Sequence, residues 1–491
     1  MSKIDCDDVN AKVICHACVG EVFLRKEILD NGDLADCSYC GVSAHCYEIS
    51  RIADRIETAF AQHFRRTSDQ PNSWQYSALS DRESTYDWER DGEPVVDAIL
   101  NAADISLTAA EDIQRVLEEK HSDFDAARMG DETDFSSESC YEKTSGQNAE
   151  NEWGEKWHAF ERSLKTEARF FSRSATADLK SVFEDIDRMS TGSSKPLVVN
   201  AGPGTTLNAV FRARVFQSQA KLLEAICRPD EHLGSPPAVF AVAGRMNARG
   251  ISVFYGATEP GIAIAEVRPP VGSEVAVARF EIVSPLKLLD LTALSDVVEP
   301  GSIFDPIWTL RLDRANFLRS LSKRMTRPVM PDDEAFEYLP TQALADYLAS
   351  VHEPPLDGIV FPSAQGAGTA RNVVLFHKAA RVATLQIPAG TVITAESGYH
   401  DGDGWEVDFT VSEEVPPANQ GSTDAKLSTF PDIEYPKWQP QNEDMREVSL
   451  RVDTTAIKVH GVQRVEFFCE AHAVSRHRRV MSGLSKLKGS A

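Results

Sequence analysis

The sequence lacks any apolar run long enough to span a bilayer, for which about 20 consecutive apolar residues are needed. No basic segment followed by a short apolar run opens it, so we expect no secretory signal peptide. Positive charge is scarce, because 51 Lys and Arg stand against 75 Asp and Glu and give a formal net charge of -24. This balance argues against non-specific binding to nucleic acid or to anionic membranes. We expect a cytoplasmic protein with neither a membrane nor bulk nucleic acid as a partner.

Motifs of two common enzyme classes are also absent. No G-x-G-x-x-G follows a strand-like run, which excludes a Rossmann dinucleotide site. No G-x-S-x-G is present, which argues against the nucleophile elbow of an α/β-hydrolase. Residues 191–208 contain Gly202-Pro-Gly204 but lack the strand, the lysine and the helix of a phosphate loop. We therefore interpret this Gly/Ser/Pro-rich segment as a linker.

The nine cysteines are an odd number, and four of them fall in a metal-type pattern rather than a disulfide framework. Four of them form two C-x-x-C pairs about eighteen residues apart, a spacing typical of zinc knuckles: Cys15, Cys18, Cys37 and Cys40. Four thiolates fill a tetrahedral zinc ion and leave no position for water. The pattern predicts a structural zinc site within residues 1–48.

The most informative stretch runs from Gly244 to Pro269. Residues 251–255 alternate as a buried strand would, and Thr258 is placed to cap a helix that ends at Glu266. The rest of that helix consists of Ala, Ile and Gly. A lone buried carboxylate is costly, so we expect Glu266 to be paired or functional.

Seven elements in this part of the chain resemble, in order, the motifs of the RES domain, a family named for an arginine, a glutamate and a serine. They are Phe211-Arg212, Gly244-Arg245-Met246-Asn247, Val253-Phe254-Tyr255, Ile264-Ala265-Glu266, a helix with Tyr338, Gln342 and Tyr347, Asp357-Gly358-Ile359 with Pro362-Ser363, and Asn372 to Phe376. The resemblance implies a fold similar to ADP-ribosyltransferases, consumption of NAD, and the toxin role in a RES–Xre toxin–antitoxin pair. An Xre-type antitoxin is then the implied protein partner.

Cleavage of the nicotinamide–ribose bond passes through an oxocarbenium-like state, as glycoside cleavage does. It needs a fixed cation for the pyrophosphate, a carboxylate beside the ribose and a platform for the nicotinamide. By resemblance to the family, the catalytic residues are Arg245, Tyr255, Glu266 and Ser363. The predicted cofactor-binding residues are Arg212, Arg214, Asn247, Gln342 and Asn372. Arg212 and Arg214 lie on the same strand face, so either is a candidate for the pocket arginine.

Residues 49–190 show the apolar spacing of amphipathic helices. With the cysteine pairs before it, this region looks like the HEPN-type domain found ahead of some RES domains. Arg115 and His121 fit the R-x4-6-H motif of HEPN ribonucleases loosely, and Val116 departs from it. An Arg and a His six apart on a helix are more often solvated neighbours.

The sequence therefore predicts a multidomain α+β protein of 491 residues. The expected parts are a zinc knuckle (1–48), a helical domain (49–190), a RES domain (205–390) and a β-rich extension (391–491) that either stands apart or completes the RES domain. The basic stretch from Arg476 to Lys488 contrasts with the acidic remainder and is expected to be a solvated tail or a contact for an acidic partner surface.

The expected activity is degradation of NAD by a glycohydrolase or a phosphorylase, with structural zinc. An alternative is a protein mono-ADP-ribosyltransferase, because water, phosphate and a protein side chain can all accept the ribose after the same bond cleavage. A hypothesis of another class is a catalytically silent sensor or scaffold whose pocket only binds a nucleotide.

Overall fold

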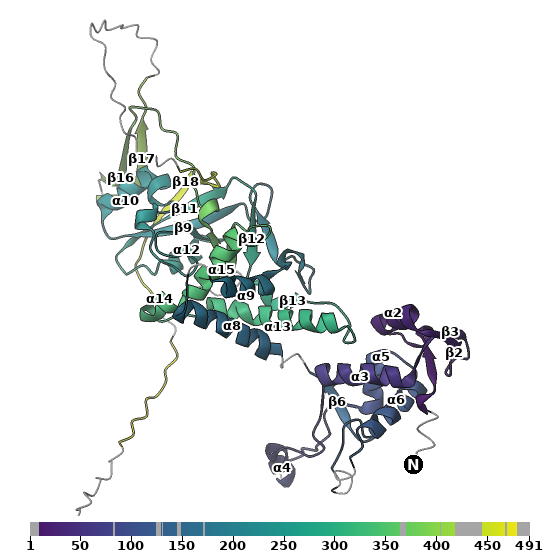
Figure 1. The fold of residues 1–491 in the computed structure, drawn as a ribbon. Coiled ribbons are helices and arrows are strands. Elements are labelled where there is room, and N and C mark those ends of the chain that lie inside the picture. Colours follow the sequence, from purple (N-terminus) through teal and green to yellow (C-terminus); the bar gives the residue numbers. More distant parts are fainter. Residues whose placement is uncertain are drawn as a thin grey trace, which may run out of the picture.

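The fold is mixed α+β (Figure 1). The computed structural model describes residues 9–81, 84–123, 129, 131–144, 149–169, 172–363, 370–402, 404–417, 444–466 and 469–478. None of the helices in these ranges combines the length and the apolarity needed to cross a bilayer.

Residues 9–144 form a separate group of elements, here called the N-terminal lobe (Figure 1). Most of its helices pack around one buried apolar cluster that includes Leu24, Ile56 and Phe60. The helices are α2 (Val22–Asn31), α3 (Ile49–His63), α4 (Ser73–Ser80), α5 (Val95–Ala103) and α6 (Leu107–Lys120). A three-stranded antiparallel sheet carries the cysteine pairs, in the order β1 (Val13–Cys15), β3 (Ser43–Glu48) and β2 (Asp33–Asp36).

The apolar spacing had predicted a helical region after residue 48. This part of the lobe is not purely helical. A second small sheet joins β4 (Phe64–Arg66), β6 (Cys140–Lys143) and β5 (Glu93–Pro94). These strands are two to four residues long. A period of two cannot be recognised over so few residues, and their partners are far apart in the sequence.

An eight-stranded sheet organises the rest of the molecule. Its order is β18 (Leu450–Gly461), β11 (Glu274–Ile282), β9 (Ala209–Phe216), β10 (Phe254–Ala257), β15 (Arg371–Leu375), β14 (Gly358–Pro362), β12 (Leu286–Asp290) and β8 (Val198–Ala201). All neighbours are antiparallel except β12 and β14. Edge strand β8 lies inside the segment 191–208 that we expected to be a linker.

Both faces of this sheet are covered. On one face, strand residues such as Ile359 and Val374 share an apolar cluster with four helices: α8 (Ala149–Thr166), α9 (Arg173–Phe183), α13 (Pro306–Thr326) and α15 (Leu339–Ser350). On the other face, Val360 and Val373 pack in a second cluster with α10 (Gln219–Cys227). Burial on both faces explains why the central strands are continuously apolar.

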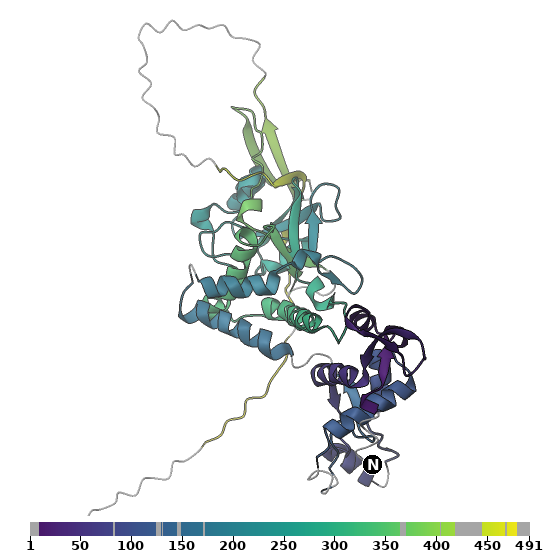
Figure 2. The same cartoon turned by 45° about the vertical axis from the view of Figure 1, so that its right-hand side comes forward.

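Helices α8 and α9 pack on the sheet although they precede residue 190 in sequence. Figures 1 and 2 show both beside α13, outside the N-terminal lobe. In the same way β18, from the expected extension 391–491, is an edge strand of the large sheet, paired with β11. The domain boundaries remain predictions, but the sheet draws its cover and one edge from beyond residues 205–390.

The strand expected at residues 251–255 begins later, at Phe254, and runs to Ala257. The polar groups of the residues before Phe254 form hydrogen bonds within loops and not with a neighbouring strand. Asn247 Nδ2 donates to the carbonyl of Ile251 at 3.0 Å, and Ser252 Oγ donates to the carbonyl of Pro236 at 2.6 Å. Local hydrogen bonds of this kind compete with strand pairing.

The N-terminal lobe contacts the rest of the chain at the start of α13. Phe304, just before that helix, is 3% exposed and belongs to the apolar cluster of the lobe. Arg55 of α3 donates to the Phe304 carbonyl at 3.0 Å and is itself held by Glu27 at 2.8 Å. His63 Nε2 lies 3.1 Å from Thr309 Oγ1. Phe304, with the partly buried Ile303 beside it, thus extends from one part of the chain into the core of the other.

Replacing Phe304 with Ala should destabilise the N-terminal lobe by about 3 kcal/mol, because it leaves a phenylalanine-sized cavity in its core. Hydrogen exchange of the α3 and α6 amides should become faster, while β14 and β15 should exchange as before. Phe336→Ala is the matched control, since Phe336 is 54% exposed. Equal exchange in both variants would show that Phe304 does not hold the lobe.

Candidate functional site

A cavity of about 390 Å³ lies against β9 and β10, beside the short helix α12 (Pro260–Glu266) and the end of α13. It is lined by Phe211, Arg212, Ala213, Arg245, Tyr255, Gly256, Ala257, Ala263, Glu266, Val267, Arg268, Thr326, Pro328, Val329, Tyr338, Phe361, Pro362 and Asn372. Residues from 211 to 372 in the sequence therefore meet in one place.

Five predicted site residues line the cavity: Arg212, Arg245, Tyr255, Glu266 and Asn372. A sixth, Ser363, is not in the lining, but its hydroxyl contacts Glu266. The other three predicted residues, Arg214, Asn247 and Gln342, are also not in the lining. Arg214 is directed elsewhere. Asn247 and Gln342 support the site from outside the cavity.

Glu266 ends α12 and is held by two donors on one oxygen. Its Oε1 accepts from Ser363 Oγ at 2.7 Å and from Asn372 Nδ2 at 2.7 Å. Asn372 lies on β15 and is only 5% exposed, so its amide is fixed. Glu266 itself is exposed, not buried as its apolar helix had suggested. The carboxylate is therefore oriented by two neighbouring side chains and remains accessible to solvent.

Thr258 does not cap α12, as we had expected. The N-cap residue is Glu259, with no side-chain capping bond. The Thr258 amide donates to the Arg371 carbonyl at 2.9 Å, and its Oγ1 accepts from the Arg371 amide at 3.1 Å. These bonds fasten the start of α12 to the start of β15. They set the distance between Glu266 and the neighbouring Asn372.

The turn that carries Arg245 is braced through Tyr255. The Tyr255 hydroxyl accepts from the Met246 amide at 3.0 Å and donates to Asn247 Oδ1 at 2.9 Å. A Cβ on Gly244 would lie 2.6 Å from that hydroxyl, so the close approach requires glycine. Burial raises the pKa of Tyr255 to about 12, which keeps the phenol neutral. Tyr255 thus offers the cavity its ring, and its hydroxyl is already engaged.

Helices on the far side of the turn complete the brace. Gln342 Nε2 donates to the Gly244 carbonyl at 2.8 Å. The Arg245 guanidinium donates to the carbonyls of Met325 at 2.8 Å and Arg327 at 3.0 Å, at the end of α13. Its Cζ also lies 4.8 Å from the centre of the Tyr338 ring. Asn247 and Gln342 therefore position Arg245.

The structure separates the two candidate pocket arginines. Arg212 lines the cavity, donates to the Tyr255 carbonyl at 3.4 Å and lies 4.9 Å from the centre of the Phe254 ring. Arg214 is exposed and donates to the carbonyl of His232. Burial, and next the charge of Arg214, lower the pKa of Arg212 to about 10, so it stays cationic at neutral pH.

The motif comparison missed one cation. Arg268 also lines the cavity, two residues after Glu266, and has a left-handed backbone with φ of 44°. Three arginines therefore share the lining with a single carboxylate. None of the three forms an ion pair with a carboxylate in the described part of the chain. The only sequence signal was the basic residue in the Glu-Val-Arg run, which is weak alone.

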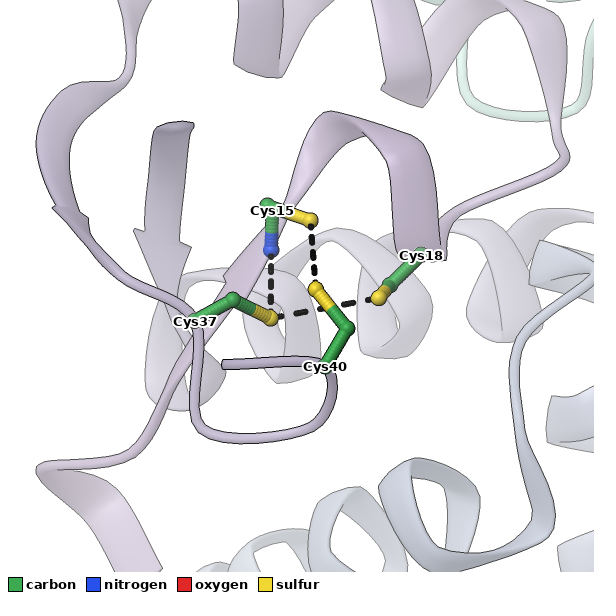
Figure 3. A group of neighbouring side chains, drawn as sticks. All are labelled: Cys15, Cys18, Cys37 and Cys40. Atoms are coloured by element: carbon green, nitrogen blue, oxygen red, sulfur yellow. Dashed lines mark hydrogen bonds between the residues drawn. The ribbon is translucent and has the colours of Figure 1, made fainter. Parts of the chain in front are cut away.

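The four predicted zinc ligands converge in the N-terminal lobe (Figure 3). All four sulfur atoms lie within 4.8 Å of one another; Cys15 Sγ is 3.6 Å from Cys40 Sγ, and Cys37 Sγ is 3.9 Å from Cys18 Sγ. A tetrahedral ion with Zn–S bonds of about 2.3 Å would place its sulfurs about 3.8 Å apart. The cluster could hold a metal ion, and its donors fit zinc.

Backbone amides favour a thiolate in this cluster. Burial alone would raise the pKa of Cys37, but N–H groups of Tyr39, Cys40 and Cys15 outweigh it and lower the pKa to about 7. Cys46, also buried nearby, turns its sulfur to the carbonyls of Ala35 and Ala44.

Arg115 and His121 do not converge on a joint site. Arg115 lies 3.5 Å from Asp112 Oδ1, and His121 Nε2 lies 2.8 Å from Glu57 Oε1. Two separate carboxylates thus engage the pair, which gives no support to the ribonuclease motif.

Zinc content should be about one per chain, and a chelator should unfold the N-terminal lobe, because structural zinc contributes on the order of 10 kcal/mol. Cys40→Ser should lose the metal, as measured by elemental analysis. Cys46→Ser is the control and should keep it. Equal zinc in the two variants would contradict the assignment of the four ligands.

Comparison with known proteins agrees with the position of the cavity. Residues 223–396 match the family model of the RES domain, a family associated with toxins that act on NAD. No curated protein and no solved structure matches the chain. The matched range holds every predicted catalytic residue, whereas Arg212 on β9 precedes it.

Proposed function

Because residues 223–396 contain a RES domain, we propose that this protein cleaves the bond between nicotinamide and ribose in NAD. The observation that carries the proposal is the composition of one cavity: three arginines, one hydrogen-bonded carboxylate and several aromatic rings. We further propose the ADP-ribosyltransferase-like fold that the family implies, and a role as a toxin or defence effector in the cytoplasm with an Xre-type antitoxin as partner.

The arginines support an anionic ligand. Arg212 is a half-buried cation without a carboxylate partner among the described residues. A bound phosphate would therefore neutralise a positive charge that is otherwise unpaired and unfavourable. Arg245 is fixed by carbonyls at the end of α13, and its planar fork suits phosphate oxygens. With Arg268 they match the pyrophosphate of a dinucleotide, with Glu266 as the only opposing charge in the lining.

The rings support a ligand with flat heterocycles. Tyr255, Tyr338, Phe211 and Phe361 all line the cavity. Aromatic faces hold planar rings and fix their orientation, which is what the nicotinamide needs before its bond to ribose breaks. A cationic pyridinium is also attracted to an aromatic face.

Glu266 would act on the ribose. When the N-glycosidic bond breaks, its electron pair stays with the nicotinamide nitrogen, and positive charge develops on the ribose C1′ and ring oxygen. A carboxylate already oriented by Ser363 and Asn372 stabilises that charge without reorganisation. Water then adds at C1′ and releases a proton in a glycohydrolase, whereas a phosphate oxygen adds there in a phosphorylase.

Turnover of NAD by the purified protein, in buffer with and without phosphate, tests the proposal. Nicotinamide with ADP-ribose indicates a glycohydrolase, a phosphorylated ADP-ribose indicates a phosphorylase, and a mass gain on protein indicates a transferase. Glu266→Gln should keep NAD binding and lower turnover by about 100-fold or more, since it removes a charge from the transition state. Absence of nicotinamide release from zinc-loaded, folded protein would leave only a nucleotide-binding sensor or scaffold.

Asn372→Asp should move the acidic limb of the pH–rate profile to higher pH. Two carboxylates at about the 2.7 Å that now separates Asn372 Nδ2 from Glu266 Oε1 cannot both ionise easily, so the pair retains a proton to higher pH. Activity that needs the ionised pair is then lost earlier as the pH falls. Asn372→Ala removes the same donor without adding charge and serves as control. An identical acidic limb in both variants would mean that Asn372 does not act through Glu266.

A further inference from the structure

A two-stranded hairpin stands apart from the large sheet. Strands β16 (Val392–Asp401) and β17 (Gly404–Glu414) pair only with each other, so within the described residues each leaves its outer edge unpaired. Figures 1 and 2 show the hairpin projecting from the end of the molecule opposite the N-terminal lobe. Such free edges normally need a partner or protection.

The hairpin is attached at its base and uncovered at its tip. Ala395 and Phe409 pack against the apolar cluster around α10, and Ser397 accepts a hydrogen bond from Gln219 of that helix. Farther out, a bulge in β17 turns Trp405 and Val407 to the opposite face, where they are 51% and 68% exposed. The anchored base makes the exposed tip a stable apolar platform.

The hairpin is acidic. The register places Glu396 and Glu414 on the face that carries Trp405 and Val407, and Glu406 opposite Tyr399 on the other face; these three carboxylates and Asp408 are all exposed. None of these carboxylates forms an ion pair with a described residue. The sequence contains neither Lys nor Arg between Arg381 and Lys426. Unneutralised charge on a projecting, narrow element favours a cationic partner.

We propose that the hairpin is a docking surface for the basic segment formed by residues 471–491 of this same protein. That segment contains five Lys and Arg and no Asp or Glu, whereas the whole chain is strongly acidic. It also carries apolar residues among its charges, including Val474, which is 92% exposed. Its composition thus complements the exposed acidic and apolar side chains of the hairpin.

A long connection joins the basic segment to the large sheet. The sequence between Gly461, at the end of β18, and Arg476 spans 14 residues, which can extend over about 45 Å. Residues 471–478 form an extended segment in which Arg476 and Arg478 make no ion pair with a described residue, while His472 lies 3.9 Å from Glu470; residues 479–491 lie outside the described part. Docking does not depend on cleavage of NAD.

The test uses a labelled peptide of residues 471–491 and the protein shortened by those residues, with binding followed by fluorescence anisotropy. The peptide should bind, and its affinity should fall at least about tenfold between low and high salt, because exposed ion pairs are screened. Reversing charge at Glu406, Asp408 and Glu414 to Lys should abolish binding. The matched control reverses Asp30, Asp97 and Glu119, three exposed carboxylates of the N-terminal lobe, and should leave it intact.

A second variant, Trp405→Ser, should weaken binding without changing net charge. Equal loss in the hairpin and control variants would reduce the interaction to the overall charge of the protein and overturn the proposal, as would binding that survives the hairpin variant. Light scattering of the unshortened protein then tells the source of the segment: a dimer that dissociates when residues 471–491 are removed identifies a second copy, and a monomer identifies the same chain.

Discussion

The candidate site depends on the way one carboxylate is held at the end of a seven-residue helix. Two donors from neighbouring strand ends share Glu266 Oε1, and the backbone pairing of Thr258 with Arg371 fixes that helix to the strand that supplies Asn372. So short a helix has little stability of its own. Its position is therefore set by the sheet, and the direction of the carboxylate is a property of strand register.

Helix α13 connects this site to the N-terminal lobe. Its first turn follows Phe304, which is buried in the core of the lobe, and its last turn offers the carbonyls that hold Arg245. A helix of 21 residues spans about 32 Å. Loss of the cysteine cluster or of Phe304 would therefore first disturb the start of α13, a rigid helix whose other end lines the cavity.

The sequence predicted those parts that local pattern and spacing determine. The four cysteines meet as their spacing required, and the helix expected to end at Glu266 does end there. Contacts between distant segments could not be read in this way. The choice between Arg212 and Arg214 depends on what lies beside β9, and the brace on Arg245 depends on Gln342, about a hundred residues later. Thr258 is a residue type that favours helix N-caps, but its hydroxyl instead accepts a hydrogen bond from the Arg371 amide at the start of β15.

The charge of the cavity runs against the charge of the molecule. A chain of net charge -24 repels a dinucleotide at long range, yet screening at physiological salt limits that repulsion to about 8 Å. In the cavity lining, Arg212, Arg245 and Arg268 outnumber the single carboxylate Glu266, and they decide the local potential. The acidic exterior then disfavours binding of polyanions such as nucleic acid, which are too large to enter the cavity and stay at the outer surface. A small anion can reach the arginines. The same separation of charge by location makes the two proposals compatible in one acidic protein: a phosphate ligand at the arginines and a cationic segment on β16 and β17.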